Sequence, residues 1–116
     1  RLANTPGTTG ASLLDETIVV VLSEMGRTPK YNGTDGRDHW PYTSAMVIGN
    51  AVAGGREIGA YDTSFSGIGV DPRSGELDSN ALGVSSLDFG ATLLAMADVD
   101  PAKHLPGARP IGGILR

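Results

Sequence analysis

The run from Thr17 to Ser23 constrains the fold more than any other segment. Its sequence is Thr-Ile-Val-Val-Val-Leu-Ser, an apolar, β-branched stretch in which polar and apolar residues do not alternate. Such a run is typical of a strand that is buried on both faces in a parallel sheet. A second apolar run, from Ser44 to Asn50, predicts a shorter strand near the first. We therefore expect an α/β fold with a mostly parallel sheet.

One helix is predicted with a clear start and end. Ser85 or Ser86 can cap it, Asp88 is favourably placed in the first turn, and the Asp100-Pro101 pair ends it. Its expected apolar face consists of Leu87, Ala91, Leu94 and Ala95. A parallel sheet needs helices on both faces, and only one strong helix is present. The chain of 116 residues is therefore expected to be a single piece of a larger α/β domain.

The remaining segments are rich in residues that favour turns. Seventeen glycines and seven prolines occur among the 116 residues, a larger share than in average proteins. We expect loops over residues 1–16, 24–41 and 62–82. The apolar residues from Ile111 to Leu115 predict a short closing strand.

Composition excludes several classes of function. A net charge of −4 without any basic run argues against a nucleic-acid partner. The longest apolar run, Ile18 to Leu22, is far shorter than the roughly 20 residues that cross a bilayer, so no transmembrane segment is predicted. The absence of cysteine excludes disulfides and a thiolate nucleophile. Gly67-Ile68-Gly69 lacks the third glycine of a dinucleotide-binding loop, so no nucleotide cofactor is predicted.

The residues best suited to chemistry follow the first predicted strand. They lie in the segments Ser23–Pro29 and Gly36–Pro41. Ligands of open α/β sheets bind at the carboxyl ends of strands, where this loop begins. Its carboxylates and imidazole are ligands of the kind that bind Zn²⁺, Mn²⁺ or Ca²⁺, and they belong to Glu24, Asp38 and His39.

Two arginines in the same loop suit an anionic substrate. The guanidinium groups of Arg27 and Arg37 can each bind two oxygens of a phosphate, sulfate or carboxylate group. A second interpretation stays open, because the same charged residues can form a salt-bridged brace that stabilises a glycine-rich loop. His39, next to Trp40, can equally be a packed residue, and His104 has no acidic neighbours and is interpreted as a surface residue.

Taken together, the strand Thr17–Ser23, the Ser-Glu-Met-Gly-Arg-Thr-Pro segment that ends at Pro29, and Gly36–Pro41 resemble the signature of the DUF1501 family. These bacterial, often exported proteins are placed in the alkaline phosphatase-like, sulfatase-like superfamily. The Gly54-Gly55 turn and the helix around Leu87–Leu94 follow in the same order. The resemblance extends from about Leu13 to the end and corresponds to the C-terminal part of longer proteins.

The resemblance implies a fold, a location and an activity. The implied fold is the C-terminal part of an alkaline phosphatase-like α/β/α sandwich. The implied location is extracytoplasmic, in the periplasm or at the cell surface. The implied activity is metal-assisted hydrolysis of a phosphate or sulfate ester, with a nucleophile outside this chain. The implied partners are an anionic small molecule or glycan as substrate and the remainder of the parent chain.

The resemblance also assigns expected roles to single residues. Glu24 stands where the superfamily has a metal-binding aspartate, and His39 matches its later histidine. Met25 occupies the place of another histidine and is not a ligand for a hard metal. We expect Glu24 and His39 to hold a divalent metal, Arg27 and Arg37 to stabilise charge on the anion, and Asp38 to orient His39 or join the metal. The alternative is a non-catalytic cell-surface or carbohydrate-associated binding protein in which these residues are structural.

Overall fold

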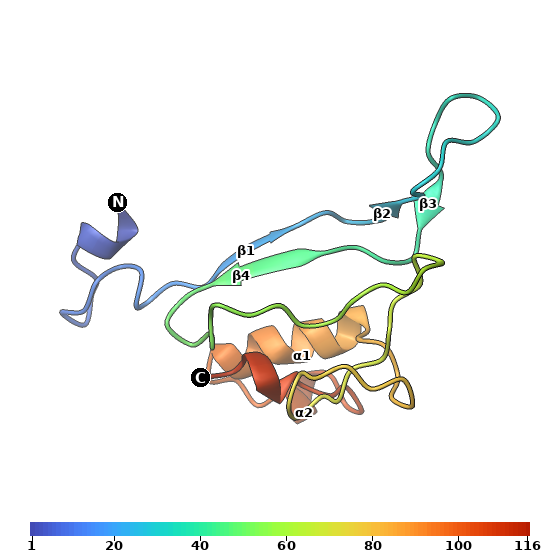
Figure 1. The fold of residues 1–116 in the computed structure, drawn as a ribbon. Helices are drawn as coiled ribbons and strands as arrows, with labels where there is room; N and C mark the ends of the chain where they lie inside the picture. Colours follow the sequence, from blue (N-terminus) through green and yellow to red (C-terminus); the bar gives the residue numbers. More distant parts are fainter.

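The computed structural model describes residues 1–116 and contains two short antiparallel sheets and two helices (Figure 1). Strand β1 (Val19–Leu22) pairs with β4 (Ala45–Ile48), and β2 (Gly26–Arg27) pairs with β3 (His39–Trp40). The helices are α1 (Ser86–Met96) and α2 (Pro101–His104). Two 3-10 turns, η1 (Leu2–Asn4) and η2 (Gly112–Ile114), lie near the two ends of the chain. Neither helix has the length and apolar character needed to span a bilayer.

The expected parallel α/β/α sandwich is wrong. Strands β1 and β4 run antiparallel, with Val19 opposite Ile48 and Leu22 opposite Ala45. A parallel pair needs a crossover connection, usually a helix, and residues 23–44 contain no helix. The chain leaves β1, turns and comes directly back to β4, so the connection itself dictates antiparallel pairing.

The two sheets are two stretches of one long, bent hairpin. Three residues (23–25) join β1 to β2, whereas four residues (41–44) join β3 to β4. One extra residue on one strand is characteristic of a β-bulge, which bends the strand and shifts the register. The hairpin bends between its two paired stretches, and β2–β3 points away from the body (Figure 1). We refer to residues 26–40 as the arm and to β1 with β4 as the ribbon.

The ribbon is more exposed than the sequence predicts. Val21 and Leu22 of β1 are 52% and 55% exposed, and Met46 of β4 is 53% exposed. The main packing between elements joins β1 to β4, β2 to β3 and α1 to α2, so no layer of helices covers the ribbon. The radius of gyration is 16.5 Å, compared with about 13 Å for a compact domain of this length. The expectation of a strand buried on both faces is therefore wrong for this chain.

The core lies along one face of α1. The predicted start of this helix is confirmed, because the Ser85 hydroxyl accepts a hydrogen bond from the Asp88 amide and the Asp88 carboxylate accepts one from the Ser85 amide. This reciprocal capping box satisfies two amides that the first turn of a helix leaves free. The buried side chains belong to Val52, Val70, Asp88, Ala91, Thr92, Met96 and Ile111, and four of these residues lie on one face of α1.

The buried face of α1 differs from the expected one. Ala91 is fully buried as predicted, but Leu87 is 59% exposed. The buried positions include the polar residues Asp88 and Thr92 in place of Leu87. A hydrophobic pattern alone does not identify this face, because the C-terminal segment binds α1 through polar atoms.

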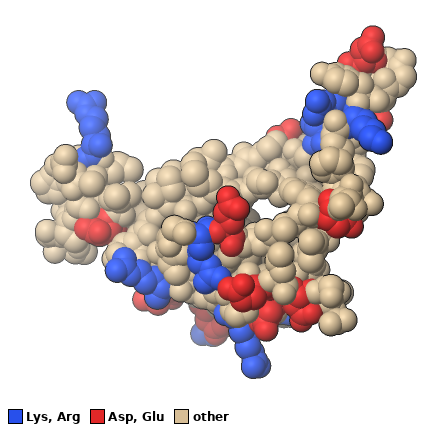
Figure 2. Space-filling view, in the orientation of Figure 1, with Lys and Arg blue, Asp and Glu red and all other residues tan.

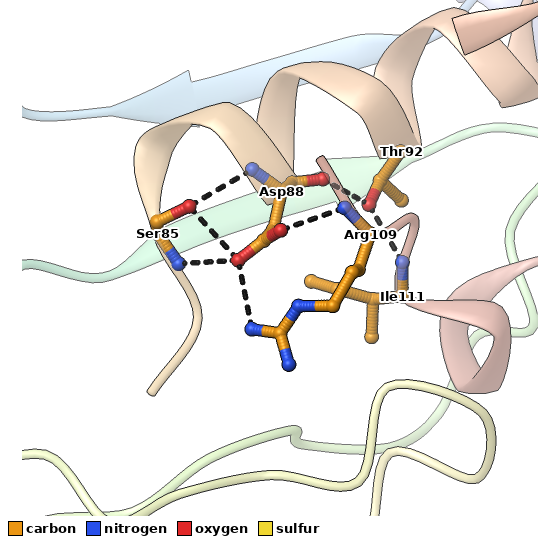
Figure 3. A network of polar contacts seen from close by, with 5 residues as sticks. All are labelled: Ser85, Asp88, Thr92, Arg109 and Ile111. Atoms are coloured by element: carbon orange, nitrogen blue, oxygen red, sulfur yellow. Dashed lines mark hydrogen bonds and ion pairs between the residues drawn. The ribbon is translucent and has the colours of Figure 1, made fainter. Parts of the chain in front are cut away.

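Asp88 and Thr92 hold the C-terminal segment against α1 (Figure 3). The Asp88 carboxylate accepts hydrogen bonds from the amide of Arg109 at 2.7 Å and from its guanidinium at 3.3 Å. It also accepts from the Ser85 amide and hydroxyl, at 3.0 and 2.8 Å. The Thr92 hydroxyl donates to the Asp88 carbonyl and accepts from the Ile111 amide. We refer to these five residues as the Asp88 network.

The charge of Asp88 is strongly stabilised despite its burial. Burial by itself raises the pKa of this carboxyl, because it disfavours the charged form. The hydrogen bonds from the Arg109 amide, from Ser85 and from the Arg109 guanidinium outweigh that effect and lower the pKa to about 2. The carboxylate therefore remains ionised over the whole neutral and mildly acidic range.

The expected closing strand from Ile111 to Leu115 is wrong. Residues Gly112–Ile114 form the turn η2, and only Leu115 makes a single bridge, to Val52. The Gly112 amide donates to the Pro72 carbonyl at 2.6 Å, and a Cβ atom at Gly113 would collide with the Ser74 carbonyl. The two glycines thus allow a close backbone approach that a regular strand with side chains does not permit.

The N-terminal residues form turns, as predicted, but they are held by a contact that the sequence does not reveal. The Glu16 carboxylate accepts four hydrogen bonds, from the amides and hydroxyls of Thr8 and Thr9. These hydrogen bonds, with that of the Thr9 hydroxyl the strongest, lower the pKa of Glu16 to about 2.

Candidate functional site

Four of the five predicted site residues lie on the arm, where the pairing of β2 with β3 brings their backbones close together in space. Arg27 in β2 lies opposite His39 in β3, and Arg37 and Asp38 immediately precede β3. Beyond the paired residues, the Thr28 amide donates to the Asp38 carbonyl at 3.0 Å, and the Asp38 amide donates to the Thr28 hydroxyl at 3.1 Å. Glu24 lies outside the arm, three residues before Arg27. All five side chains are exposed.

Asn32 organises the loop at the end of the arm. Its side-chain oxygen accepts hydrogen bonds from the amides of Thr34 and Gly36 and from the Thr34 hydroxyl. Its side-chain nitrogen donates to the Asp38 carboxylate at 2.8 Å. The Asn-Gly pair identifies a turn in the sequence, but the contact with Asp38 depends on the return of the chain to β3.

Replacing Asn32 with alanine is expected to loosen the loop without unfolding the body. The change removes four hydrogen bonds, each worth about 0.5–1.5 kcal/mol. Amide hydrogen exchange at Thr34 and Gly36 should accelerate at least tenfold, while exchange in α1 stays unchanged. Asn80→Ala, which removes an exposed asparagine outside the arm, is the matched control. Equal exchange at Thr34 in the two variants would contradict the assigned role.

The arm does not assemble a metal site from its own residues. The Asp38 carboxylate is engaged by Asn32, and the Glu24 carboxylate accepts only a long hydrogen bond of 3.4 Å from the Ser23 hydroxyl. Nowhere in the chain do three histidine, aspartate or glutamate side chains gather closely enough to hold a metal ion. Zinc sites in proteins use three or four protein ligands. The side chains of this chain therefore do not form a metal site by themselves, and the role of Glu24 and His39 as ligands of a divalent metal stays a prediction.

The arginines of the arm are not paired with carboxylates. The Arg27 guanidinium donates to the Arg37 carbonyl at 3.4 Å, and the Arg37 guanidinium lies over the Tyr31 ring, 4.8 Å from its centroid. The ion pairs of the chain are all elsewhere, in the pairs Arg56–Glu76, Lys103–Asp100 and Arg109–Asp88. Positive side chains gather on the arm near its base (Figure 2). The charged residues of the arm therefore do not form the salt-bridged brace that the sequence left open. The Asp38 carboxylate instead binds the neutral side chain of Asn32 in the loop.

A small pocket rich in aromatic side chains adjoins these arginines. Its volume is about 180 Å³, and its lining consists of Arg27, Pro29, Trp40, Tyr42, Tyr61 and Phe65. Trp40 and Tyr42 meet edge to face with centroids 6.1 Å apart, and Tyr42 meets Tyr61 in the same way. Such edge-to-face pairs are favourable for aromatic rings. This pocket could not be predicted from the sequence, because Tyr61 and Phe65 come from a distant loop.

A hydrogen bond fixes that loop against the arm. The Trp40 indole donates to the Phe65 carbonyl at 3.1 Å. The loop itself is a tight turn in which the Asp62 carboxylate accepts from the amides of Ser64 and Ser66, and Phe65 has a positive φ of 61°. Gly67 leaves room for the Tyr42 ring, which lies within 2.9 Å of the position of a Cβ atom.

A larger hollow, of about 720 Å³, lies beside β4 and is less suited to chemistry. It is lined by aliphatic residues of β4, by three glycines and by Val52, with Arg56 and Glu57 as its charged residues. The Arg56 guanidinium is already used, because it pairs with Glu76 at 3.2 Å and donates to two carbonyls. The arm therefore remains the candidate functional site.

Comparison with known proteins identifies the chain at the level of a family. Residues 9–110 match the family model described as "Protein of unknown function (DUF1501)". No curated protein and no solved structure matches the chain. The matched range includes the whole arm and all of the Asp88 network except Ile111. The match shows the family and does not show membership of the alkaline phosphatase-like superfamily.

Proposed function

We propose that this chain, which belongs to the DUF1501 family, binds the anionic group of a phosphate or sulfate ester at its arm, as part of a hydrolase-like protein. One observation carries the proposal. Arg27, Lys30 and Arg37 lie on the same arm, and none of them forms an ion pair, in a chain whose net charge is −4. In a chain with an excess of carboxylates, a group of unpaired cations favours an external anion as their partner.

The geometry supports arginine-based recognition of a tetrahedral anion. A guanidinium presents several N–H donors in one plane and binds two oxygens at once, which a neutral loop does not. The Tyr31 ring supports Arg37 from one face and leaves its N–H edge available. Arg27 uses only one long hydrogen bond within the chain. Both groups can therefore turn toward an ester oxyanion at little cost.

Titration with methyl phosphate and methyl sulfate tests this proposal directly. In the purified protein, the double variant Arg27→Gln/Arg37→Gln should bind both esters at least tenfold more weakly, because two charge-assisted contacts of about 1.5–3 kcal/mol each are lost. Arg73→Gln is the matched control, since Arg73 is exposed, unpaired and outside the arm. Binding should also weaken with added sodium chloride. Equal affinities of wild type and the double variant would contradict the proposal.

The same experiment separates catalysis from binding. Turnover of 4-nitrophenyl phosphate or sulfate that depends on Arg27 and Arg37 would support hydrolysis. Binding of the methyl esters without any turnover would favour the second candidate, a non-catalytic binding protein. The aromatic pocket beside Arg27 supports this second candidate, because its lining can hold a ligand without any catalytic group.

A further inference from the structure

We propose that the aromatic pocket beside Arg27 binds a sugar ring, so that the ester recognised by the arm is a sulfated or phosphorylated carbohydrate. This inference rests on the proposed anion binding and adds the class of molecule that carries the anion. The pocket is formed where the arm meets the loop from Tyr61 to Gly67, and Arg27 belongs to both the cationic group and the pocket lining. A ligand bound through its anion at Arg27 therefore has its remaining atoms next to the aromatic rings.

The rings of this pocket are unusually accessible for aromatic side chains. Tyr61 is 46% exposed, Phe65 is 49% exposed and Tyr42 is 36% exposed. Large aromatic residues normally bury most of their area, so a cluster of open rings marks a contact surface. The backbone at Phe65 is held in a turn: Phe65 has a positive φ of 61°, and the Trp40 indole donates a hydrogen bond to its carbonyl. The Phe65 ring is therefore displayed by a fixed turn.

The chemistry of the lining fits a sugar better than a purely apolar group. The faces of aromatic rings pack against the C–H groups of a pyranose, and phenolic hydroxyls bond to its hydroxyls. No hydrogen bond within the chain uses the hydroxyl of Tyr42 or Tyr61, whereas the Trp40 N–H is already satisfied by Phe65. The lining thus combines ring faces, two free hydroxyls and one guanidinium.

The size of the pocket limits the occupant to a single ring. Its volume of about 180 Å³ is smaller than the roughly 300–1,000 Å³ of pockets for drug-sized ligands. One monosaccharide unit fits, and any further units of a chain would extend into solvent. The ligand class is therefore a sugar ring with an anionic ester substituent, either free or as one unit of a glycan.

The test compares esters that share the anion and differ in the attached group. Affinities are measured for methyl sulfate, glucose 6-sulfate and phenyl sulfate, and for the corresponding phosphates. Glucose 6-sulfate or glucose 6-phosphate should bind about tenfold more tightly than the methyl ester, because the sugar ring adds contacts with more than one aromatic side chain. In Tyr61→Leu the affinity of the glucose ester relative to the methyl ester should fall severalfold, because one of the rings that line the pocket is lost. Leu82→Ala, which truncates another exposed apolar side chain outside the pocket, should leave the ratio unchanged.

A conservative variant separates a sugar from an aromatic ligand. Tyr61→Phe keeps the ring and removes the hydroxyl, so it should weaken the glucose esters severalfold and leave phenyl sulfate unaffected. A phenyl ester that gains as much affinity as the glucose esters would overturn the sugar assignment. If the wild type binds the methyl ester and the glucose ester with equal affinity, the sugar inference is overturned, whereas the proposed anion site is still supported. Failure of every ester to bind would overturn the anion site itself, and the inference with it.

Discussion

Replacing Asp88 with asparagine is expected to lower the free energy of unfolding by about 2–4 kcal/mol. The asparagine keeps the size of the side chain but loses the charge, and its amide group cannot accept all four hydrogen bonds that the carboxylate receives from Ser85 and Arg109. It also leaves the Arg109 guanidinium without its partner, at a position where the Asp88 side chain is only 7% exposed. Urea denaturation at neutral pH measures the loss.

The pH dependence of the same variant tests the lowered pKa of Asp88. A carboxyl whose pKa is lower in the folded state stabilises the protein above its unfolded pKa, and this contribution disappears as the pH falls through the folded pKa. For Asp88 the ordinary value is 3.8 and the folded value is about 2. The stability difference between wild type and Asp88→Asn should be constant above about pH 5 and should shrink progressively as the pH falls through 3.8 toward about 2. Glu16 titrates in the same range in both proteins, so its contribution cancels.

Asp35→Asn is the matched control for Asp88→Asn. Asp35 is exposed, lies at the end of the arm and has a positive φ of 56°, a conformation that asparagine adopts as readily as aspartate. Its replacement should change the unfolding free energy by less than about 0.5 kcal/mol. A comparable loss in both variants would show that a general effect of charge, rather than the Asp88 network, holds α1 to the C-terminal segment.

Replacing Gly26 with alanine is expected to abolish ester binding by disrupting the arm. A Cβ atom at this position would overlap the Tyr42 carbonyl and come within 3.1 Å of the Trp40 carbonyl. Both neighbours are backbone atoms at the bulge, so the clash is relieved only if the pairing of Gly26 with Trp40 is lost. Separation of β2 from β3 would move Arg27 away from the pocket. Titration with methyl sulfate and glucose 6-sulfate should show no binding, and the overlap should also destabilise the fold by about 1–3 kcal/mol.

Gly33→Ala provides the control on the same arm. Its Cβ atom would meet no other atom within 4 Å, and its φ does not lie in the left-handed region. This variant should bind the esters like the wild type. Full binding by Gly26→Ala would show that the close approach at the bulge is not needed for the site.

Local structure was predicted well where short-range chemistry decides it. The helix begins at Ser86 with Ser85 as its cap, because capping involves residues only a few positions apart. It ends at Met96, before Asp100-Pro101 as predicted, but the proline is not what stops it: Asp98 already has a positive φ of 61°, and Pro101 begins α2 with Asp100 as its cap. The strands β1 and β4 lie within the two apolar runs that predicted them. The DUF1501 resemblance was also confirmed, since it rests on a continuous pattern of residues.

The candidate site was predicted only in part. The sequence identified Arg27, Arg37, Asp38 and His39 as one group, and the pairing of β2 with β3 brings their backbones together. It did not identify the side-chain partners, because Asp38 is bound by Asn32 and Arg37 lies on Tyr31. Both partners lie within the turn of the arm, and their contacts depend on how that turn closes.

The sequence by itself determined where the ribbon strands and α1 lie and which charged residues the arm carries. Tertiary structure decided the direction of strand pairing, the burial of Asp88 against Arg109, and the meeting of Trp40 with Phe65. The physical reason is the range of the interactions. Caps, turns and β-branched runs act between near neighbours, whereas β1 pairs antiparallel because no crossover helix separates it from β4, and the aromatic pocket exists only because a loop 25 residues away docks on the arm.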